Sequence, residues 1–414
     1  MRLLACILIA LPTLGFISSA QAEDWPGFLG PHRNGISAEK NLIDSWPENG
    51  PREVWRVQGG VGMSGIAVSQ GKCVTLVQRA DQQRLVAHDV SKGAPLWDTP
   101  IAPAFENQMG DGPRATPTIV GDKVFAFTGE GILVGASLKD GKVLWSINLL
   151  KEFGGKMADY GMAASPLVVD GNVIVIVGGK DASVVACDAV TGKVRWAIGE
   201  DPAGYSSPVL LTLQGEEQVV AYTGGSAIGL LPRSGKLLWR FPFETDYGCN
   251  IAAPLAIGDR VFISSGENHG SVLLSLTKQG ELFTATPTWE SLGPKSVMRN
   301  EWQTSVLLDG HLYGFDNVGG AGPISHLTCI EAATGKRVWQ KARFGKGNMI
   351  AADGKLFIVT IEGELVIAKA TTKGYEELGR KEICKQTRQA PALANGMLYV
   401  RDGEEIVCLD VRKK

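Results

Sequence analysis

The stretch Asp188-Ala-Val-Thr-Gly-Lys-Val-Arg-Trp196 decides the fold, because shorter or altered copies of it recur along the chain. In each copy a glycine is followed four residues later by a tryptophan, and the copies end at Trp97, Trp145, Trp196, Trp239 and Trp339. Successive copies are 48, 51 and 43 residues apart from Trp97 to Trp239, and the last interval of 100 residues spans two repeats. A repeat of about 40 to 50 residues indicates a solenoid, a propeller or an array.

The local chemistry of each copy predicts a β-hairpin. The glycine supplies the positive φ that a tight hairpin turn needs. The strand after the turn carries a tryptophan, whose large apolar side chain has to be buried. One hairpin cannot bury that side chain alone, whereas a neighbouring copy packed against it can. Repetition is therefore required for stability.

A second set of turns gives the number of repeats. Eight turn pairs lie between alternating apolar runs and predict eight first hairpins, at Gln70-Gly71, Gly121-Asp122, Asp170-Gly171, Gly215-Glu216, Gly258-Asp259, Asp309-Gly310, Asp353-Gly354 and Asn395-Gly396. Seven second hairpins follow, and in two of them Thr284 and Leu378 stand at the tryptophan position. The eighth repeat stops at Asp410, before its last strand. We expect residues 53–57, which carry Trp55 without a hairpin of their own, to supply that strand.

The sequence therefore predicts an all-β fold, an eight-bladed β-propeller of four-stranded antiparallel blades. The N-terminal strand completes the last blade, and this closure removes the exposed sheet edge that an open array would leave. Residues 53–414 are expected to form this single domain, and residues 23–52, rich in glycine and proline, an N-terminal strap. Trp25 and Phe28 suggest that the strap packs on a propeller face; a binding role is the alternative.

Residues 1–22 predict a secretory signal peptide. Arg2 is followed by an apolar run over residues 3–17 and by the small-x-small site Ala20-Gln-Ala22. We expect cleavage near Ala22 and export, to the periplasm or beyond the cell. No other segment is long and apolar enough to predict a transmembrane span.

The composition and motifs of the chain argue against nucleic-acid binding, metal binding and the common nucleophile and phosphate-binding sites. The net charge is −2 and the basic residues form no stripe, so we expect no nucleic-acid partner. The five histidines are isolated and lack metal-ligand spacing, and no nucleophile or phosphate-binding motif is present. We expect the six cysteines of the mature chain to be mostly free, buried thiols, and the protein to be a monomer.

The segments that enter each blade hold the candidate site. The first strand of each blade lines the central channel, so these segments ring its mouth. Side chains that differ from blade to blade are what an asymmetric ligand site needs, and a solvated rim is the alternative. The candidate binding residues are Arg114, Asp159, Tyr160, Tyr205, Asp246, Tyr247, Asn250, Arg299, Glu301, Trp302, Gln303 and Arg388. No catalytic residue and no metal ligand is assigned.

One insertion is expected to matter most. Residues 286–303 are predicted to be the longest stretch without a strand between two blades. They hold Trp289 and Trp302, neither of which lies four residues after a turn glycine. Long loops on one side of a rigid scaffold often carry function.

The repeats carry a family resemblance. The segments ending at Trp196 and Trp339 resemble the Ala-x-Asp-x-x-Thr-Gly-x-x-x-Trp repeat of the pyrroloquinoline quinone (PQQ)-like β-propellers, and the resemblance covers nearly the whole mature chain. That superfamily includes the quinoprotein alcohol dehydrogenases, which hold PQQ and Ca²⁺ over the channel. It also includes the propeller subunit of the outer-membrane β-barrel assembly machinery, which has no cofactor and binds other proteins.

The resemblance implies two functions. The adjacent Cys-Cys pair of the dehydrogenases is missing here. We therefore expect an exported, non-catalytic binding or scaffold protein without a cofactor, with a protein partner or small ligand at the channel mouth. The alternative is a small PQQ-dependent alcohol dehydrogenase, in which Arg114 or Arg388 would hold the acidic quinone against Trp302 and Glu301 could join a Ca²⁺ site. A third hypothesis is a purely structural repeat protein.

Overall fold

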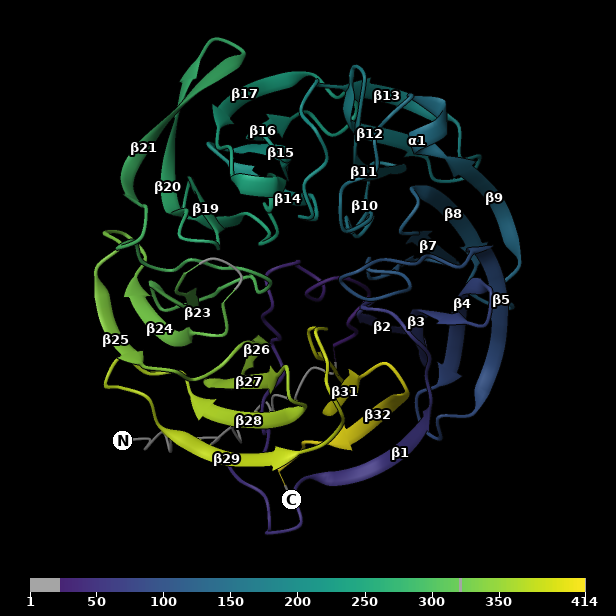
Figure 1. The fold of residues 1–414 in the computed structure, drawn as a ribbon, viewed down its shortest axis with the longest axis vertical. Helices are drawn as coiled ribbons and strands as arrows, with labels where there is room; N and C mark the ends of the chain where they lie inside the picture. The colour runs from purple at the N-terminus through teal and green to yellow at the C-terminus, as the bar shows by residue number, and fades with distance from the viewer. Residues whose placement is uncertain (1–22, 320–321, 414) are drawn as a thin grey trace, which may run out of the picture.

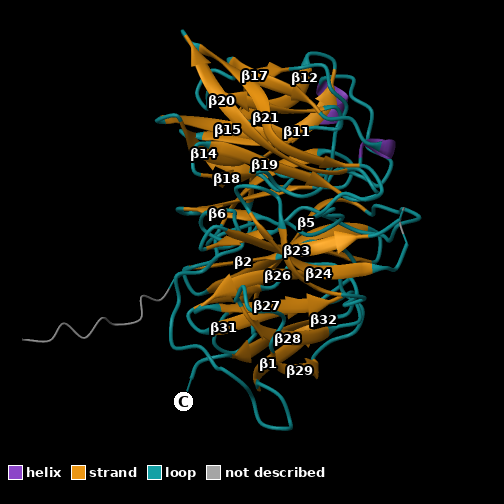
Figure 2. Cartoon of the chain, turned by 90° about the vertical axis from the view of Figure 1, so that its left-hand side faces the viewer, coloured by secondary structure: helices purple, strands orange, loops and turns teal. Residues whose placement is uncertain are grey.

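Eight antiparallel sheets of four strands each form a closed ring (Figure 1). The structure is a computed structural model that describes residues 23–319 and 322–413, so the predicted signal peptide lies outside it. Seen edge-on, the sheets lie side by side with loops on both faces of the ring (Figure 2). The predicted eight-bladed propeller is confirmed.

The strands of each blade follow one another outward from the centre. Blade 1 comprises β2 (Ile66–Ser69), β3 (Lys72–Arg79), β4 (Gln82–Asp89) and β5 (Pro95–Pro103). Blade 2 comprises β6 (Thr118–Val120), β7 (Lys123–Phe127), β8 (Ile132–Ser137) and β9 (Val143–Asn148). Blade 3 comprises β10 (Leu167–Val169), β11 (Asn172–Gly179), β12 (Ala182–Asp188) and β13 (Val194–Ile198). Blade 4 comprises β14 (Val209–Leu213), β15 (Glu216–Tyr222), β16 (Ser226–Leu230) and β17 (Leu237–Pro242).

The second half of the ring repeats this order. Blade 5 comprises β18 (Leu255–Ile257), β19 (Arg260–Ser265), β20 (Gly270–Gln279) and β21 (Leu282–Leu292). Blade 6 comprises β22 (Val306–Leu308), β23 (His311–Asn317), β24 (Ser325–Glu331) and β25 (Arg337–Lys341). Blade 7 comprises β26 (Gly347–Ala352), β27 (Lys355–Thr360), β28 (Glu364–Lys369) and β29 (Glu377–Glu382). Blade 8 comprises β30 (Ala392–Ala394), β31 (Met397–Arg401), β32 (Glu405–Asp410) and β1 (Arg52–Gln58).

Helix is nearly absent from the described residues. They contain the four-residue helix α1 (Leu149–Glu152) and the 3-10 turn η1 (Asp246–Gly248). Neither these nor any other described helix has the length and hydropathy to cross a membrane.

The ring closes through the N-terminal strand, as predicted. β1 pairs antiparallel with β32, from Arg52 opposite Asp410 to Gln58 opposite Glu405. A buried side chain secures the same closure: the Arg401 guanidinium of β31 donates to the carbonyl oxygens of Gly60 and Ser64, which precede blade 1, at 2.5 and 3.4 Å. A buried arginine that donates to several carbonyl oxygens is held rigidly, so Arg401 fixes the position of blade 8 relative to the segment that precedes blade 1.

The repeated tryptophan joins neighbouring blades. In every copy except Trp239, whose Nε1 donates to the Gln218 side chain of its own blade, the indole Nε1 donates to a backbone carbonyl of the next blade. In most copies the ring also lies against the turn glycine there, so that a Cβ on Gly192 would lie 2.6 Å from the Trp145 ring. The Nε1–oxygen pairs that cross from one blade to the next are Trp55–Val90, Trp97–Leu138, Trp145–Ala189, Trp196–Pro232, Trp289–Ala332 and Trp339–Thr371. The glycine of the motif is thus needed for its small size as well as for its positive φ.

Two sequence predictions about blade 5 are wrong. Trp289, and not Thr284, occupies the tryptophan position, because it bonds to Ala332 of blade 6 as its counterparts do. The hairpin of β20 and β21 is longer than the others, so its turn at Gly280 lies nine residues before the tryptophan instead of four. For the same reason residues 286–292, expected to lie in a loop, belong to β21.

The motif aspartate fixes the turn that carries the glycine. Asp188 accepts hydrogen bonds from the backbone N–H groups of Val190 (2.9 Å) and Thr191 (2.7 Å), and its other oxygen pairs with Arg195. The Arg195 pair first, and then the turn N–H groups, lower the pKa of Asp188 from 3.8 to about 2. A carboxylate stabilised in this way helps the hairpin to form only while it is ionised.

This turn predicts a pH dependence. Because the folded pKa lies below the unfolded one, the stability that Asp188 contributes is complete above pH 3.8 and is lost as the pH falls through about 2. Asp188→Asn should therefore lower the unfolding temperature at pH 6 and cause a smaller difference at pH 3. A difference between wild type and variant that is the same at both pH values would contradict this assignment.

The strap crosses one face of the ring. Trp25 pairs with Val68 at the end of β2 through two backbone hydrogen bonds, and Ile36 bridges to Ala351 at the end of β26. Both contacts lie where the inner strands run into their first turns, opposite the segments that enter the blades. The strap therefore covers the channel on the face away from the predicted site.

Candidate functional site

A cavity of about 180 Å³ occupies the centre of the ring. Its walls come from residues just before the inner strands of several blades, and its base from Trp25, Phe28 and Leu29 of the strap. Trp25 and Leu29 are only 2% and 5% exposed, so the strap closes this end. The cavity is thus a cup that opens towards the segments entering the blades.

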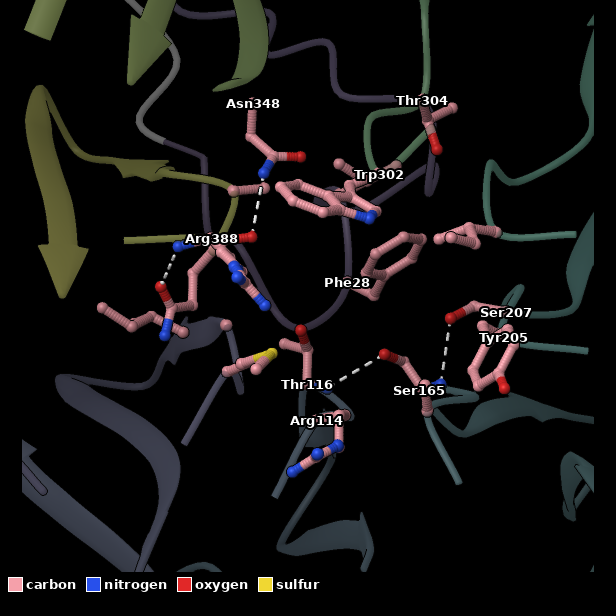
Figure 3. Close-up of a pocket in the computed structure, with 18 of the residues that line it drawn as sticks. Phe28, Arg114, Thr116, Ser165, Tyr205, Ser207, Trp302, Thr304, Asn348 and Arg388 are labelled. Carbon is pink, nitrogen blue, oxygen red and sulfur yellow. Dashed lines mark hydrogen bonds between the residues drawn. The ribbon is translucent and has the colours of Figure 1, made fainter. Parts of the chain in front are cut away.

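Repeated hydroxyl groups build the wall of the cup (Figure 3). The backbone N–H of Thr116 donates to Ser165 Oγ, and that of Ser165 donates to Ser207 Oγ, both at 2.9 Å. The N–H of Ala253 donates to Thr304 Oγ1 at the same distance. Each hydroxyl belongs to the blade after the one that donates to it, so these residues fix the spacing of the blades around the cup.

Five of the twelve predicted residues line the cup: Arg114, Tyr160, Tyr205, Trp302 and Arg388. The Tyr160 and Tyr205 rings lie 5.6 Å apart at 31°, and the Tyr160 N–H donates to the Tyr205 hydroxyl at 3.2 Å. Burial raises the pKa of both phenols, so they stay neutral and offer an apolar face with a polar edge.

Arg114 is held by the protein itself. Its guanidinium donates to the carbonyl oxygens of Gly110 (2.6 Å), Gly112 and Tyr160 (2.8 Å), and it lies 4.5 Å from the centre of the Phe105 ring. Burial lowers the pKa of Arg114 to about 10. Three of its five N–H donors, one on each nitrogen, are used on carbonyls, so Arg114 orders the loop around residues 110–112 and has less capacity to bind an acidic ligand than a free guanidinium.

Arg388, unlike Arg114, lies against the ring of Trp302 and donates to only one carbonyl. Its guanidinium lies 4.8 Å from the centre of the Trp302 ring, and Nη1 donates to the Met109 carbonyl at 2.9 Å. Lys346 Nζ also lies 4.5 Å from the Trp302 ring and pairs with Glu301 at 2.6 Å. Burial raises the pKa of Glu301, which Lys346 and Arg388 oppose. Trp302 thus lies beside two cations, of which only Lys346 has a carboxylate partner.

The other predicted residues lie outside the lining of the cup. Asn250, Arg299 and Gln303 are buried and bond to the protein: the Asn250 amide donates to two carbonyls, Arg299 forms a two-pronged ion pair with Asp316 at 2.7 and 3.1 Å, and Gln303 accepts from the Phe315 N–H. Glu301 is also buried. Asp159, Asp246 and Tyr247 are exposed on the loops around the mouth.

Sequence reasoning missed the base and part of the wall. Phe28 and Leu29 come from the strap, Met63 and Met109 from loops, and Asn348 from β26. Trp25 and Phe28 predicted that the strap packs on a propeller face, because an apolar pair in a segment without strand pattern has to be buried somewhere, but the prediction did not place them in the site. Nothing in the repeat pattern marks Met63 or Met109.

The lining residues do not fit PQQ with Ca²⁺. The described residues that line the cup include no aspartate, glutamate, histidine or cysteine, and the described part of the chain contains no cluster of such groups that could hold a metal ion. Ca²⁺ binds through several oxygen ligands and prefers carboxylates among them. The six described cysteines are buried and unbonded, as expected. The described lining of this cup therefore lacks the carboxylates that the dehydrogenase hypothesis needs, both as Ca²⁺ ligands and as the catalytic base.

Comparison with known proteins finds both branches of the expected superfamily. The outer membrane protein assembly factor BamB of Yersinia pestis is 23% identical over 75% of this chain and 76% of its own length. The crystal structure of BamB from Moraxella catarrhalis has a TM-score of 0.56 at 13% identity, covering 86% of this chain and 98% of that one. The quinohemoprotein alcohol dehydrogenase of Comamonas testosteroni has a TM-score of 0.66 at 15% identity, covering 94% of this chain and 81% of that one.

A family model decides the membership of the chain. The model named PQQ_2, described as outer membrane protein assembly factor BamB, matches residues 47–149, 81–321 and 323–413. The first two matches overlap, and the three together span the propeller from its first strand to its last. The chain belongs to the PQQ_2 family of BamB-like β-propellers.

Proposed function

We propose that this chain is an exported, non-catalytic binding protein that receives its partner at the mouth of the cup. The observation that carries the proposal is the composition of the cup, which is aromatic, apolar and hydroxyl-bearing, with one arginine available for binding. General base and nucleophilic catalysis use a carboxylate, imidazole, thiol, amine, phenol or activated hydroxyl at the site, and burial raises the pKa of the two phenols in this cup, Tyr160 and Tyr205. The lining also offers aliphatic hydroxyl groups, but three of them, on Ser165, Ser207 and Thr304, accept hydrogen bonds from backbone N–H groups of the preceding blade.

Family membership supports a protein as the partner. The relative from Yersinia pestis is named outer membrane protein assembly factor BamB, and the similar structure from Moraxella catarrhalis is named BamB. A partner protein engaged in outer membrane protein assembly is therefore proposed here too. The predicted signal peptide is consistent with export to the compartment where such a partner would be met. The candidate contact residues are those around the mouth, Asp159, Tyr160, Asp246, Tyr247, Trp302 and Arg388.

Site-specific crosslinking tests this proposal. Tyr247 is 71% exposed on the loop entering blade 5, and Val190 is 68% exposed on an outer turn of blade 3. With a photoreactive amino acid at position 247 of the exported protein, we expect a crosslinked species of defined mass. The same amino acid at position 190 should give none. Equal crosslinking at both positions, or none at either, would count against a partner at the mouth.

Thermal unfolding with and without cofactor distinguishes the proposed binding protein from the alternative, a PQQ-dependent dehydrogenase. A ligand at about a hundred times its dissociation constant stabilises the folded state by about 2.7 kcal/mol. We expect no such shift on adding PQQ with Ca²⁺, because the lining supplies no carboxylate for the cation. A stabilisation that appears only when both are present, together with dye-linked alcohol oxidation, would support the enzyme instead.

A further inference from the structure

The guanidinium of Arg388 has donors to spare. Nη1 bonds to the Met109 carbonyl, whereas Nε and Nη2 make no hydrogen bond to the described residues. The side chain is half-buried at the wall of the cup and lies against Trp302 (Figure 3). A partly buried guanidinium with unused N–H groups leaves hydrogen-bonding capacity that a ligand could satisfy.

No described carboxylate forms an ion pair with Arg388. The described lining of the cup contains no acidic residue, and the nearby Glu301, which also acts on Arg388 electrostatically, is paired with Lys346. Burial is the main cause that lowers the pKa of Arg114, and Arg388 lowers it further, whereas Asp111 and Glu130 oppose the shift; Arg114 is thus a second positive charge in the wall, partly offset by carboxylates outside the lining. A negatively charged ligand would therefore be attracted into the cup, and a cation repelled.

A third cation lies below the base of the cup. Arg33 is 8% exposed, and its guanidinium donates to the carbonyl oxygens of Ser165 (2.8 Å) and Pro166 (2.9 Å), while Nε has no partner among the described residues. The Arg33 guanidinium lies 5.6 Å from the centre of the ring of Phe28, which forms the base of the cup together with Trp25 and Leu29. No acidic residue pairs with Arg33 in the described chain, so its charge adds to the positive potential inside the cup.

Apolar side chains make up much of the remaining base and wall of the cup. Phe28, Leu29, Met63 and Ile66 line it together with Trp302. A free inorganic anion would leave these surfaces unfilled, whereas an organic acid would bury its apolar part against them. The planar fork of an arginine matches the two oxygens of a carboxylate.

We infer that the cup binds a monoanionic organic ligand, a carboxylate joined to an apolar body, with Arg388 as its charge partner. The inference rests on the proposed function, because it specifies what enters the same mouth. Two sources carry this chemistry: a free organic acid, and the C-terminal carboxylate of a polypeptide that ends in an apolar residue.

Calorimetric titration of the mature protein with matched probes tests the inference. We expect 3-phenylpropionate to bind, and 3-phenylpropanol and 3-phenylpropylamine, which keep the apolar body but not the negative charge, to bind at least about tenfold more weakly. The peptide N-acetyl-Ala-Ala-Phe as free acid and as amide identifies the source, because its acetyl group removes the N-terminal positive charge that the cup would repel. Tighter binding of the free-acid peptide than of phenylpropionate, lost in the amide, would assign a chain terminus; the reverse order would assign a small acid.

Substitutions of Arg388 test whether this residue binds the probe acid. Arg388→Gln should weaken binding of the acid by about tenfold or more, and Arg388→Lys, which keeps the charge without the fork, should retain part of it. Arg233→Gln is the matched control, because Arg233 lies on an outer turn with its side chain 85% exposed. Acid binding that persists in Arg388→Gln, or equal binding of acid, alcohol and amine, would overturn the inference.

The two proposals can fail separately. If no probe binds but the crosslink at position 247 forms, the carboxylate inference is wrong and the binding function stands. If the acid binds through Arg388 and no crosslink forms, the site takes a small ligand and the proposal of a protein partner is wrong. Absence of both results rejects both.

Discussion

Replacing Asp316 with alanine should lower the free energy of unfolding by about 3–5 kcal/mol. Its side chain is fully buried and accepts from the backbone N–H, Nε and Nη2 of Arg299. Removing the carboxylate would leave the guanidinium of Arg299, itself 5% exposed, buried without a counter-charge. Urea denaturation measures the loss, and Asp316→Asn, which keeps the shape and one acceptor, should lose less.

The same pair tests whether Arg299 belongs to the site. Arg299→Met combined with Asp316→Leu should be more stable than the two single effects predict together, because neither charge is then left unpaired. If Arg299 only supports the fold, the double variant should still bind the probe acid and crosslink through position 247. A variant of unchanged stability that has lost binding would return Arg299 to the list of ligand contacts.

Trp289→Ala should lower the free energy of unfolding by about 2–4 kcal/mol, somewhat less than the cost for a fully buried tryptophan. The partly buried ring packs against Phe262 at 5.9 Å and covers Gly335 of blade 6, and its Nε1 bonds to the Ala332 carbonyl. The substitution would open a gap between blades 5 and 6 and leave that carbonyl without its donor. Denaturation monitored by circular dichroism measures the change.

Thr284→Ala provides the control for this assignment. Thr284 lies four residues after the turn glycine and is exposed on β21, so its replacement should change stability by less than about 0.5 kcal/mol. A larger loss at Thr284 than at Trp289 would show that spacing from the turn, and not the contact with blade 6, defines the tryptophan position.

The sequence predicted the fold well because its period is a local signal that the structure repeats. Turn glycines and blade tryptophans recur wherever one blade packs on the next, so the number of blades and the role of residues 53–57 follow from counting. Trp289 does not follow the spacing, because a longer hairpin changes its distance from the turn glycine without changing its contact with blade 6. A rule based on distance from the glycine cannot detect a tryptophan that reaches the same neighbour from a longer strand.

The site was predictable only in part. The position of the entering segments brought Tyr160, Tyr205, Trp302 and Arg388 to one cup, because the propeller fold itself places them there. It could not separate side chains that face the cup from those that bond to the protein, as Asn250 and Arg299 do. That distinction depends on partners such as Asp316, which lies on a different strand and carries no motif.

Closure of the ring by β1 has a consequence for the way the molecule folds. Arg52 and Asp410 face each other in one sheet although 358 positions separate them in the chain. Contacts between such distant residues slow folding, because the intervening chain has to be ordered before they can form. During synthesis β1 emerges first and waits, unpaired, until the last residues are made. We expect the final, slow step of folding to be the docking of this strand, and a chain that ends before β32 to remain an open ring with two exposed sheet edges.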